Sequence, residues 1–175
     1  IEFYNTFEGI SPQASQPSST LTRKAPYDVF INHRGCDVKH KLASTIYHTL
    51  DLVGLRGFLD VEELELGDSI PTKIEEAIRG ASAHIAIFSE NYAQSPWCLA
   101  ELSCMLKTGS PIFPVFYHVK PDDLRWVAQE KGIYANAFSQ HKKKHRFTSE
   151  KLQEWKTALQ DVSYISGFML NNDNE

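Results

Sequence analysis

The stretch Ala83-His-Ile-Ala-Ile-Phe-Ser-Glu-Asn-Tyr-Ala-Gln-Ser-Pro-Trp-Cys-Leu-Ala-Glu-Leu102 joins an apolar run to a strong signal for the start of a helix. Residues 83–88 are short and apolar, which is typical of a buried strand. Ser95 followed by Pro96 favours a helix start, because Ser accepts hydrogen bonds from free backbone amides and Pro suits the first helical position. The stretch therefore predicts a strand, a loop and a helix in that order.

Trp97 and Glu101 are four residues apart in this predicted helix, so we expect them to share a face near its start. The more apolar stripe of the helix is formed by other residues, Leu99, Leu102 and Leu106. A carboxylate beside an indole, just after a buried strand, can meet a positively charged group of a ligand. The alternative is that Glu101 is an ordinary solvated helix residue.

The same alternation of strand and helix continues along the chain on both sides of this stretch. We predict strands over residues 27–31, 55–59, 83–88, 111–117 and 168–170, and helices over about 38–53, 70–78, 96–106, 120–126, 134–145 and 152–162. Such alternation predicts right-handed crossovers and an α/β fold whose mostly parallel sheet is covered by helices on both faces.

Ligands of such sheets bind beyond the carboxyl ends of the strands, where the strand order reverses. Three loops follow the first three predicted strands, at residues 32–37, 60–69 and 89–96. We therefore expect these loops to converge around Glu101, with His33 in the first of them.

The length of 175 residues fits one domain with tails. Residues 1–25 are rich in Ser and Pro and predict a disordered leader, residues 26–170 are expected to fold, and residues 171–175 form a polar tail. The net charge of -4 gives no overall attraction to nucleic acid or an anionic membrane. No apolar stretch is long enough to span a bilayer, so we expect no membrane association.

The three cysteines, Cys36, Cys98 and Cys104, are odd in number and lack the spacing of metal ligands. They indicate a reducing compartment, so the cytoplasm is the expected location, with the nucleus as an alternative. No histidine has the pattern of a metal ligand, and His84 is interpreted as a core residue. The run His141-Lys-Lys-Lys-His-Arg146 could contact phosphate or a nuclear import receptor, although charged runs at helix ends are usually solvated surface.

The chain lacks the common catalytic and phosphate-binding motifs: G-x-G-x-x-G, G-x-x-x-x-G-K, G-x-S-x-G and H-E-x-x-H. It does contain four ordered blocks, at residues 27–35, 58–67, 88–102 and 114–125, that together resemble a plant-type TIR (Toll/interleukin-1 receptor) domain. The resemblance covers about residues 26–170. It implies a flavodoxin-like sheet of four to five strands in the order 2-1-3-4-5.

Many TIR domains are similar to NAD-cleaving hydrolases that signal in plant innate immunity and cell death. The resemblance implies that Glu101 is the catalytic residue, that NAD+ or NADP+ is the substrate, and that no cofactor is needed. Trp97 would form an apolar wall, and Arg34 with the Gly35 amide would contact the diphosphate. His33, Asp60 and Ser95 complete the expected substrate-binding set. From the residues alone, Arg34 could instead be an ion-pair residue, Asp60 could shape its loop and Ser95 could only cap its helix.

The chain departs from the plant pattern in two places. It has His33-Arg-Gly-Cys-Asp-Val-Lys39 where plant members usually have Phe-Arg-Gly-Glu-Asp-Thr-Arg, so substrate affinity or specificity is expected to differ. Plant domains also tend to continue into one more helix after the segment matching residues 167–170, and we expect that helix to be absent here. It contributes to self-association in some members.

The resemblance also implies self-association through TIR–TIR contacts, during which the acidic loop at residues 60–69 rearranges and completes the pocket. Other TIR proteins are a second class of expected partner. The chief alternative is a non-enzymatic adaptor that uses the same loops for TIR–TIR contacts. A TIR domain that acts on nucleic acid through residues 142–146 is a third hypothesis, and it would require salt-sensitive binding.

Overall fold

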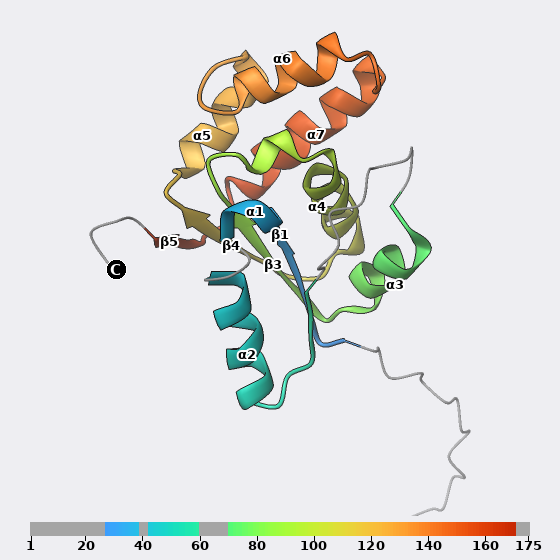
Figure 1. Cartoon of the computed structure of the whole chain (residues 1–175), viewed down its shortest axis with the longest axis vertical. Coiled ribbons are helices and arrows are strands. Elements are labelled where there is room, and N and C mark those ends of the chain that lie inside the picture. Colours follow the sequence, from blue (N-terminus) through green and yellow to red (C-terminus); the bar gives the residue numbers. More distant parts are fainter. Residues whose placement is uncertain (1–26, 39–41, 60–69, 171–175) are drawn as a thin grey trace, which may run out of the picture.

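The computed structural model describes residues 27–38, 42–59 and 70–170. Five parallel strands form one sheet in the order β2-β1-β3-β4-β5, as predicted (Figure 1). The strands are β1 Val29–His33, β2 Gly57–Leu59, β3 Ala83–Phe88, β4 Ile112–Tyr117 and β5 Phe168–Leu170. Because all five run in the same direction, their carboxyl ends lie at one edge of the sheet.

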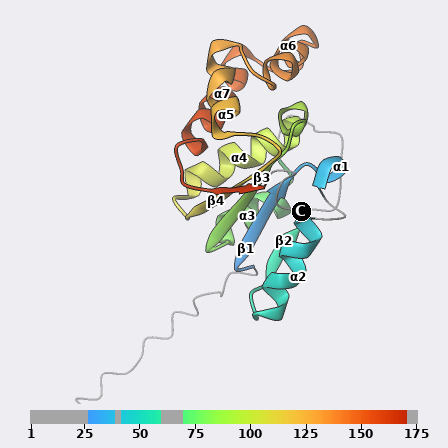
Figure 2. The ribbon, with the colours of Figure 1, turned by 90° about the vertical axis from the view of Figure 1, so that its left-hand side faces the viewer.

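Helices cover both faces of this sheet. They are α1 Gly35–Val38, α2 Ser44–Leu52, α3 Thr72–Gly80, α4 Pro96–Thr108, α5 Pro121–Trp126, α6 Ala135–Lys143 and α7 Ser149–Val162, with two 3-10 turns, η2 Tyr92–Gln94 and η3 Val127–Gln129. In Figure 2 the helices α1 and α2 lie on one side of the sheet, and α4 and α7 lie on the other. Within the described ranges every helix is too short or too polar to span a bilayer.

The strand β1 shows why the sheet needs both layers of helices. All five of its residues are buried, and successive side chains point to opposite faces. Phe30 belongs to the larger core cluster, which contains residues of α3, α4, α6 and α7. Val29 and Ile31 belong to a smaller cluster, which contains Val38 of α1 and against which partly buried residues of α2 pack. The strand β1 is thereby buried on both faces.

The predicted bounds of β1 were wrong by two residues at each end. The strand runs over Val29–His33 rather than 27–31, because its pairing with β3 continues to the partners His33 and Ile87. His33 therefore ends the strand instead of lying in the loop. Of the helix predicted over about 38–53, the described residues form the end of α1 and the whole of α2, and residues 39–41 lie outside the described part.

The remaining elements agree with the predictions except at their ends. The strands β3 and β5 have the predicted bounds, and β2 and β4 are shorter than predicted at their amino ends. Pro71 is the N-cap of α3 rather than part of its first turn, so Ile70 precedes the helix. The turn η2 between β3 and α4 was not predicted.

His84 is the core histidine that the sequence predicted. Its side chain in β3 is fully buried, and its Nε2 lies 3.0 Å from Thr108 Oγ1. The Thr108 hydroxyl donates to the Met105 carbonyl oxygen, so the imidazole must donate to Thr108 through Nε2–H. Burial lowers the pKa of His84 from 6.5 to about 4, because the charged ring would lose its hydration.

This shift predicts a loss of stability in acid. Above pH 6.5 the imidazole is neutral in both the folded and the unfolded chain, so the full stability is present. As the pH falls through the window from 6.5 to about 4, the unfolded chain binds a proton that the folded chain resists. We expect the free energy of unfolding to fall by about 3 kcal/mol across this window from His84 alone. Urea unfolding at pH 7 and pH 4 measures it, and an equal fall in His84→Gln would contradict the assignment.

Candidate functional site

Glu101 lies in the second turn of α4, close to the carboxyl ends of β1 and β3. Its side chain is only 2% exposed, and its Oε2 accepts a hydrogen bond of 2.8 Å from Asn32 Nδ2. The hypothesis that Glu101 is an ordinary solvated helix residue is therefore wrong. A buried carboxylate is costly unless it accepts hydrogen bonds, so the contact with Asn32 offsets part of the cost of burying Glu101.

The Asn32 side chain is held in one orientation by a buried network. Its Oδ1 lies 2.5 Å from the Tyr92 hydroxyl, which also lies 3.0 Å from the Cys98 carbonyl oxygen. Burial is the main cause that raises the pKa of Tyr92 well above 10, so the hydroxyl stays protonated and can donate. The Asn32 amide group must then donate towards Glu101. Three elements, β1, η2 and α4, thus position one carboxylate.

Ser95 and Trp97 occupy the first turn of the same helix. The Ser95 side chain accepts from the Cys98 amide at 3.3 Å, which is the capping role that its place before Pro96 predicts. Trp97 is half-buried and packs against the larger core cluster. Its role as an apolar wall for substrate stays a prediction, as does any contact of Ser95 with substrate.

The loop after β1 lies beside the loop after β3. Arg34 pairs with Asp37 inside the first loop, and Asp37 also accepts from the Ser89 hydroxyl at 2.5 Å. The ion pair is the arrangement that the alternative interpretation of Arg34 predicted. Gly35 is the first residue of α1, so its amide is at the start of that short helix. Contacts of Arg34 and Gly35 with a diphosphate stay predictions.

The other two residues of the predicted set contribute differently. His33 is 7% exposed, and its carbonyl oxygen accepts from the Cys98 thiol at 3.2 Å, so its backbone helps to join β1 to α4. Asp60 and the whole acidic loop at residues 60–69 lie outside the described residues. Two of the three loops expected around Glu101 are therefore brought together, and the third is not described.

The loop after β3 is also held from the side of α6. The Tyr134 hydroxyl donates to the Ser89 carbonyl oxygen at 2.7 Å, and His141 Nε2 lies 2.8 Å from the Ala93 carbonyl oxygen. Burial lowers the pKa of His141, although the bond to Ala93 acts in the opposite direction. A cavity of about 360 Å³ lies between this loop and α6, with Arg34 in its wall. Hydrogen bonds thus hold the loop after β3 from the side of the loop after β1 and from the side of α6. The cavity lies beside Arg34.

Sequence reasoning missed Asn32 and Tyr92 as site residues. The signal for Asn32 is its position, because a polar side chain that follows the apolar run Val29-Phe-Ile31 in a buried strand needs a buried partner. Tyr92 carries no comparable signal, since a tyrosine in a loop is common. Across residues 27–38, 42–59 and 70–170, no group of three or more His, Cys, Asp or Glu side chains is placed to hold a metal.

Comparisons with known proteins agree with this architecture. A family model described as the TIR domain matches residues 26–175. TMV resistance protein N of Nicotiana glutinosa is 35% identical over 160 residues, which are 89% of this chain and 14% of that protein. Disease resistance protein RPV1 of Vitis rotundifolia is 35% identical over 167 residues, covering 92% of this chain and 11% of that protein.

Two further matches are informative. "Probable 2' cyclic ADP-D-ribose synthase BdTIR" of Brachypodium distachyon is 45% identical over 98 residues, which are 56% of this chain and 44% of that protein. The TIR domains in the solved structure of the activated Roq1 resistosome, which directly recognizes the pathogen effector XopQ, match with a TM-score of 0.73 and 35% identity. That match covers 83% of this chain and 89% of the other.

The chain spans only a small part of the resistance proteins that it matches, 14% and 11% of their lengths. The match to the TIR family model covers residues 26–175 and therefore includes β1, the loops beside it and Glu101. Together with the five-stranded parallel sheet in the order 2-1-3-4-5, these matches show that the chain belongs to the TIR domain family and is related to plant disease resistance proteins over most of its length.

Proposed function

We propose that this TIR domain cleaves NAD+ at the bond between nicotinamide and ribose, with Glu101 as the catalytic residue. The observation that carries the proposal is the buried carboxylate of Glu101, which accepts from Asn32 at 2.8 Å at the carboxyl edge of a parallel sheet. Ligands of such sheets bind at that edge. A buried carboxylate held there by a second side chain supports a catalytic role for Glu101.

The reaction itself explains why a fixed carboxylate is useful. The nicotinamide ring of NAD+ is cationic, and its departure leaves oxocarbenium-like charge on the ribose, as in glycoside hydrolysis. A preorganised negative charge stabilises that state more than it stabilises the ground state, which lowers the barrier. Glu101 would accept hydrogen bonds from the ribose hydroxyls and stabilise the developing cation. Trp97 would exclude water on one side, and Arg34 with Gly35 would bind the diphosphate.

The relatives support this class of reaction. The name of the Brachypodium relative describes a probable synthase of a cyclic ADP-ribose, and the matched segments are 45% identical. Formation of a cyclic ADP-ribose from NAD+ requires loss of nicotinamide. Water would add to the ribosyl carbon and give linear ADP-ribose with release of a proton, or a nucleophilic group of the same molecule would add and give a cyclic product, with nicotinamide released in both cases. NADP+ is the other expected substrate, because it has the same glycosidic bond.

We also propose a role in plant immune signalling that depends on self-association. Resistance proteins are among the relatives, and the TIR domains of the Roq1 resistosome share the fold at 35% identity. The loop after β1 and the loop after β3 meet at one edge, through Asp37 and Ser89, so a neighbouring copy could complete the site there. Other TIR proteins are alternative partners for the same contacts.

The rate of nicotinamide release from NAD+ tests the proposal. We expect the purified chain to release nicotinamide, and the rate per molecule to rise with protein concentration, because assembly completes the pocket. Chromatography of the products measures both, with protein diluted over about a hundredfold range and with clustering on beads as the crowded limit. A constant specific rate across that range would contradict assembly-dependent catalysis. No release even when the protein is clustered would favour the non-enzymatic adaptor.

A further inference from the structure

A second cavity of about 600 Å³ lies between α3, α4, α7 and the loop that precedes α7. Its volume is within the range of pockets that bind small metabolites. One wall is a stripe of α4 with helical spacing, formed by Ala100, Ser103, Cys104 and Lys107. Glu101 is not among its lining residues, so this cavity is separate from the proposed catalytic carboxylate.

Two deeply buried polar side chains line this cavity. Ser103 is 4% exposed and Trp155 is fully buried. Among the described residues, neither Ser103 Oγ nor Trp155 Nε1 has a hydrogen-bond partner. Buried polar atoms nearly always have partners, because leaving one unpaired costs about 1–3 kcal/mol. An indole nitrogen can only donate and a hydroxyl can do so too, so both atoms suit acceptor oxygens of a ligand.

The rim of the cavity is positively charged. Four cationic side chains and two carboxylates line it: Arg79, Lys107, Arg146 and Lys151 against Glu75 and Glu154. Glu154 accepts from Lys107 at 2.5 Å and from Lys151 at 2.9 Å. Partial burial acts to raise the pKa of Glu154, but these two bonds outweigh it and lower the pKa, so the carboxylate stays charged.

The remaining lining is apolar or aromatic. Ile70 and Ala100 contribute aliphatic surface, and Phe147 packs edge-on against Trp155 with ring centroids 4.8 Å apart. Phe147 is only half-buried, so part of its ring is available for contact. A charged rim above an apolar wall fits a molecule with an anionic end and a flat or apolar body.

We propose that this cavity binds a phosphate monoester of about nucleoside monophosphate size. A phosphate monoester carries a charge of about -1.5 to -2 at neutral pH, so the cationic side chains of the rim attract it. The rim cations hold the phosphate, the apolar wall contacts the ring, and Ser103 with Trp155 donates to oxygens of the ligand body. The assignment is independent of the proposed function, because none of these contacts involves Glu101.

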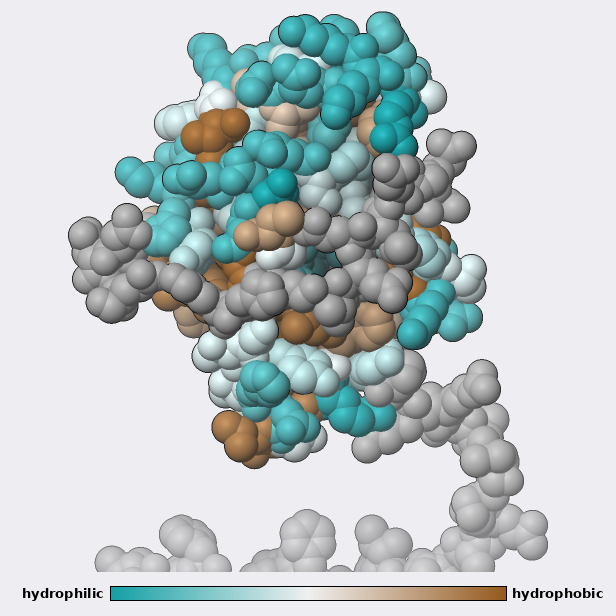
Figure 3. Space-filling view, viewed as in Figure 1, coloured by the Kyte–Doolittle hydropathy of each residue, from teal (hydrophilic) through white to brown (hydrophobic). Residues whose placement is uncertain are grey.

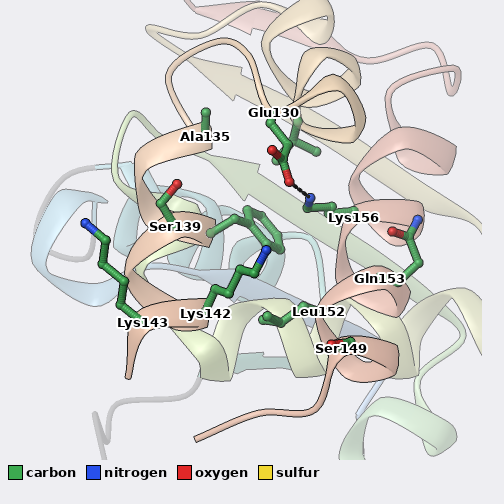
Figure 4. A pocket seen from close by; sticks show the side chains of 11 residues that line it. Glu130, Ala135, Ser139, Lys142, Lys143, Ser149, Leu152, Gln153 and Lys156 are labelled. Atoms are coloured by element: carbon green, nitrogen blue, oxygen red, sulfur yellow. Dashed lines mark hydrogen bonds and ion pairs between the residues drawn. The ribbon is translucent and has the colours of Figure 1, made fainter. Parts of the chain in front are cut away.

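A neighbouring cavity provides the matched control. It lies between α6 and α7, and Figure 4 shows Lys142 and Lys143 on its α6 side and the Lys156–Glu130 pair on the other. Figure 3 shows that hydrophilic side chains gather over this end of the molecule. Its lining also carries lysines, but the residues without partners, Ser103 and Trp155, are absent from it. Positive charge alone therefore does not distinguish the two cavities.

The test is a titration of the chain with AMP, followed residue by residue by amide NMR, with adenosine and inorganic phosphate as reference ligands. We expect AMP to shift the amides of Ser103, Thr148 and Lys151, and to bind at least about tenfold more tightly than either reference ligand. Lys107→Gln should weaken AMP binding about fivefold, since it removes a rim cation. Lys143→Gln makes the same change in net charge in the neighbouring cavity and should leave binding unchanged.

Ser103→Ala separates binding from structure. It should weaken AMP binding about fivefold while leaving the urea midpoint unchanged or higher, because the lost hydroxyl has no partner in the folded chain. Equal weakening by Lys107→Gln and Lys143→Gln would overturn the proposal in favour of diffuse attraction. Shifts confined to residues 32–37 and 95–97 would overturn it too, because AMP would then bind only at the nicotinamide-cleaving site. If inorganic phosphate binds as tightly as AMP, the apolar wall does not contact the ring of the ligand, and the proposal of a nucleoside monophosphate site is overturned.

Discussion

Replacing Glu101 by Gln should lower kcat/KM for nicotinamide release from NAD+ by about 100-fold or more, because it removes the charge that stabilises the developing ribosyl cation. The amide has nearly the same shape as the carboxylate. Its carbonyl oxygen can still accept from Asn32 Nδ2, which lies 2.8 Å from Oε2 in the wild type. The loss should therefore come from charge alone. Steady-state rates on clustered protein measure it, with product identified by chromatography.

The same variant should keep or gain stability. Glu101 is 2% exposed, and a buried charge costs more to desolvate than a neutral amide of equal size. Urea unfolding of wild type and Glu101→Gln, measured beside the rates, tells the two effects apart. A variant that is both inactive and strongly destabilised would identify Glu101 as a structural residue. An active variant would remove it from the mechanism.

Asn32→Asp should cause the largest loss of stability, about 3 kcal/mol or more at neutral pH. The substitution keeps the size of the side chain but places a second carboxylate where Nδ2 now donates to Glu101. Two buried carboxylates in contact cannot both stay charged, so the folded variant takes up a proton that the unfolded chain releases near pH 4. The deficit relative to wild type should therefore grow as the pH rises above about 4. Urea unfolding of both proteins across that range measures it.

Tyr92→Phe is the matched control in the same network. It removes the hydroxyl that lies 2.5 Å from Asn32 Oδ1 without adding a charge. We expect a loss of about 1–2 kcal/mol, the usual cost of one buried hydrogen bond that leaves an acceptor unpaired. Its difference from wild type should not change with pH. If Asn32→Asp behaves like Tyr92→Phe at every pH, then Asn32 and Glu101 are not in contact in solution.

The bounds of a helix or strand could be predicted from the sequence where they are set by neighbouring residues in the chain. The apolar runs of β3 and β5 gave their bounds, and Ser95 with Pro96 placed the start of α4, because capping is a local effect. The end of β1 could not be predicted locally. Its last residues, Asn32 and His33, are polar, and they are strand residues because β3 offers hydrogen-bonding partners up to Ile87.

In the candidate site, too, some features could be predicted from the sequence and others depend on contacts between residues far apart in the chain. The place of Glu101 at the sheet edge followed from the order of the elements, but its burial did not, because it depends on the side chains that the fold packs around it. The partners of Glu101 did not, because Asn32 is 69 residues away in the sequence and its contact exists only once α4 packs on β1. The pairing of Arg34 with Asp37 is local, yet the sequence could not distinguish it from a phosphate contact, since both use the same guanidinium.

The most direct measurement is a structure of the assembled chain with a non-cleavable NAD+ analogue. We expect the Glu101 carboxylate to accept hydrogen bonds from the nicotinamide ribose hydroxyls, with Trp97 beside the ring and Asn32 still donating to the other side of the carboxylate. An analogue bound elsewhere, with Glu101 buried and far from the ribose, would contradict it.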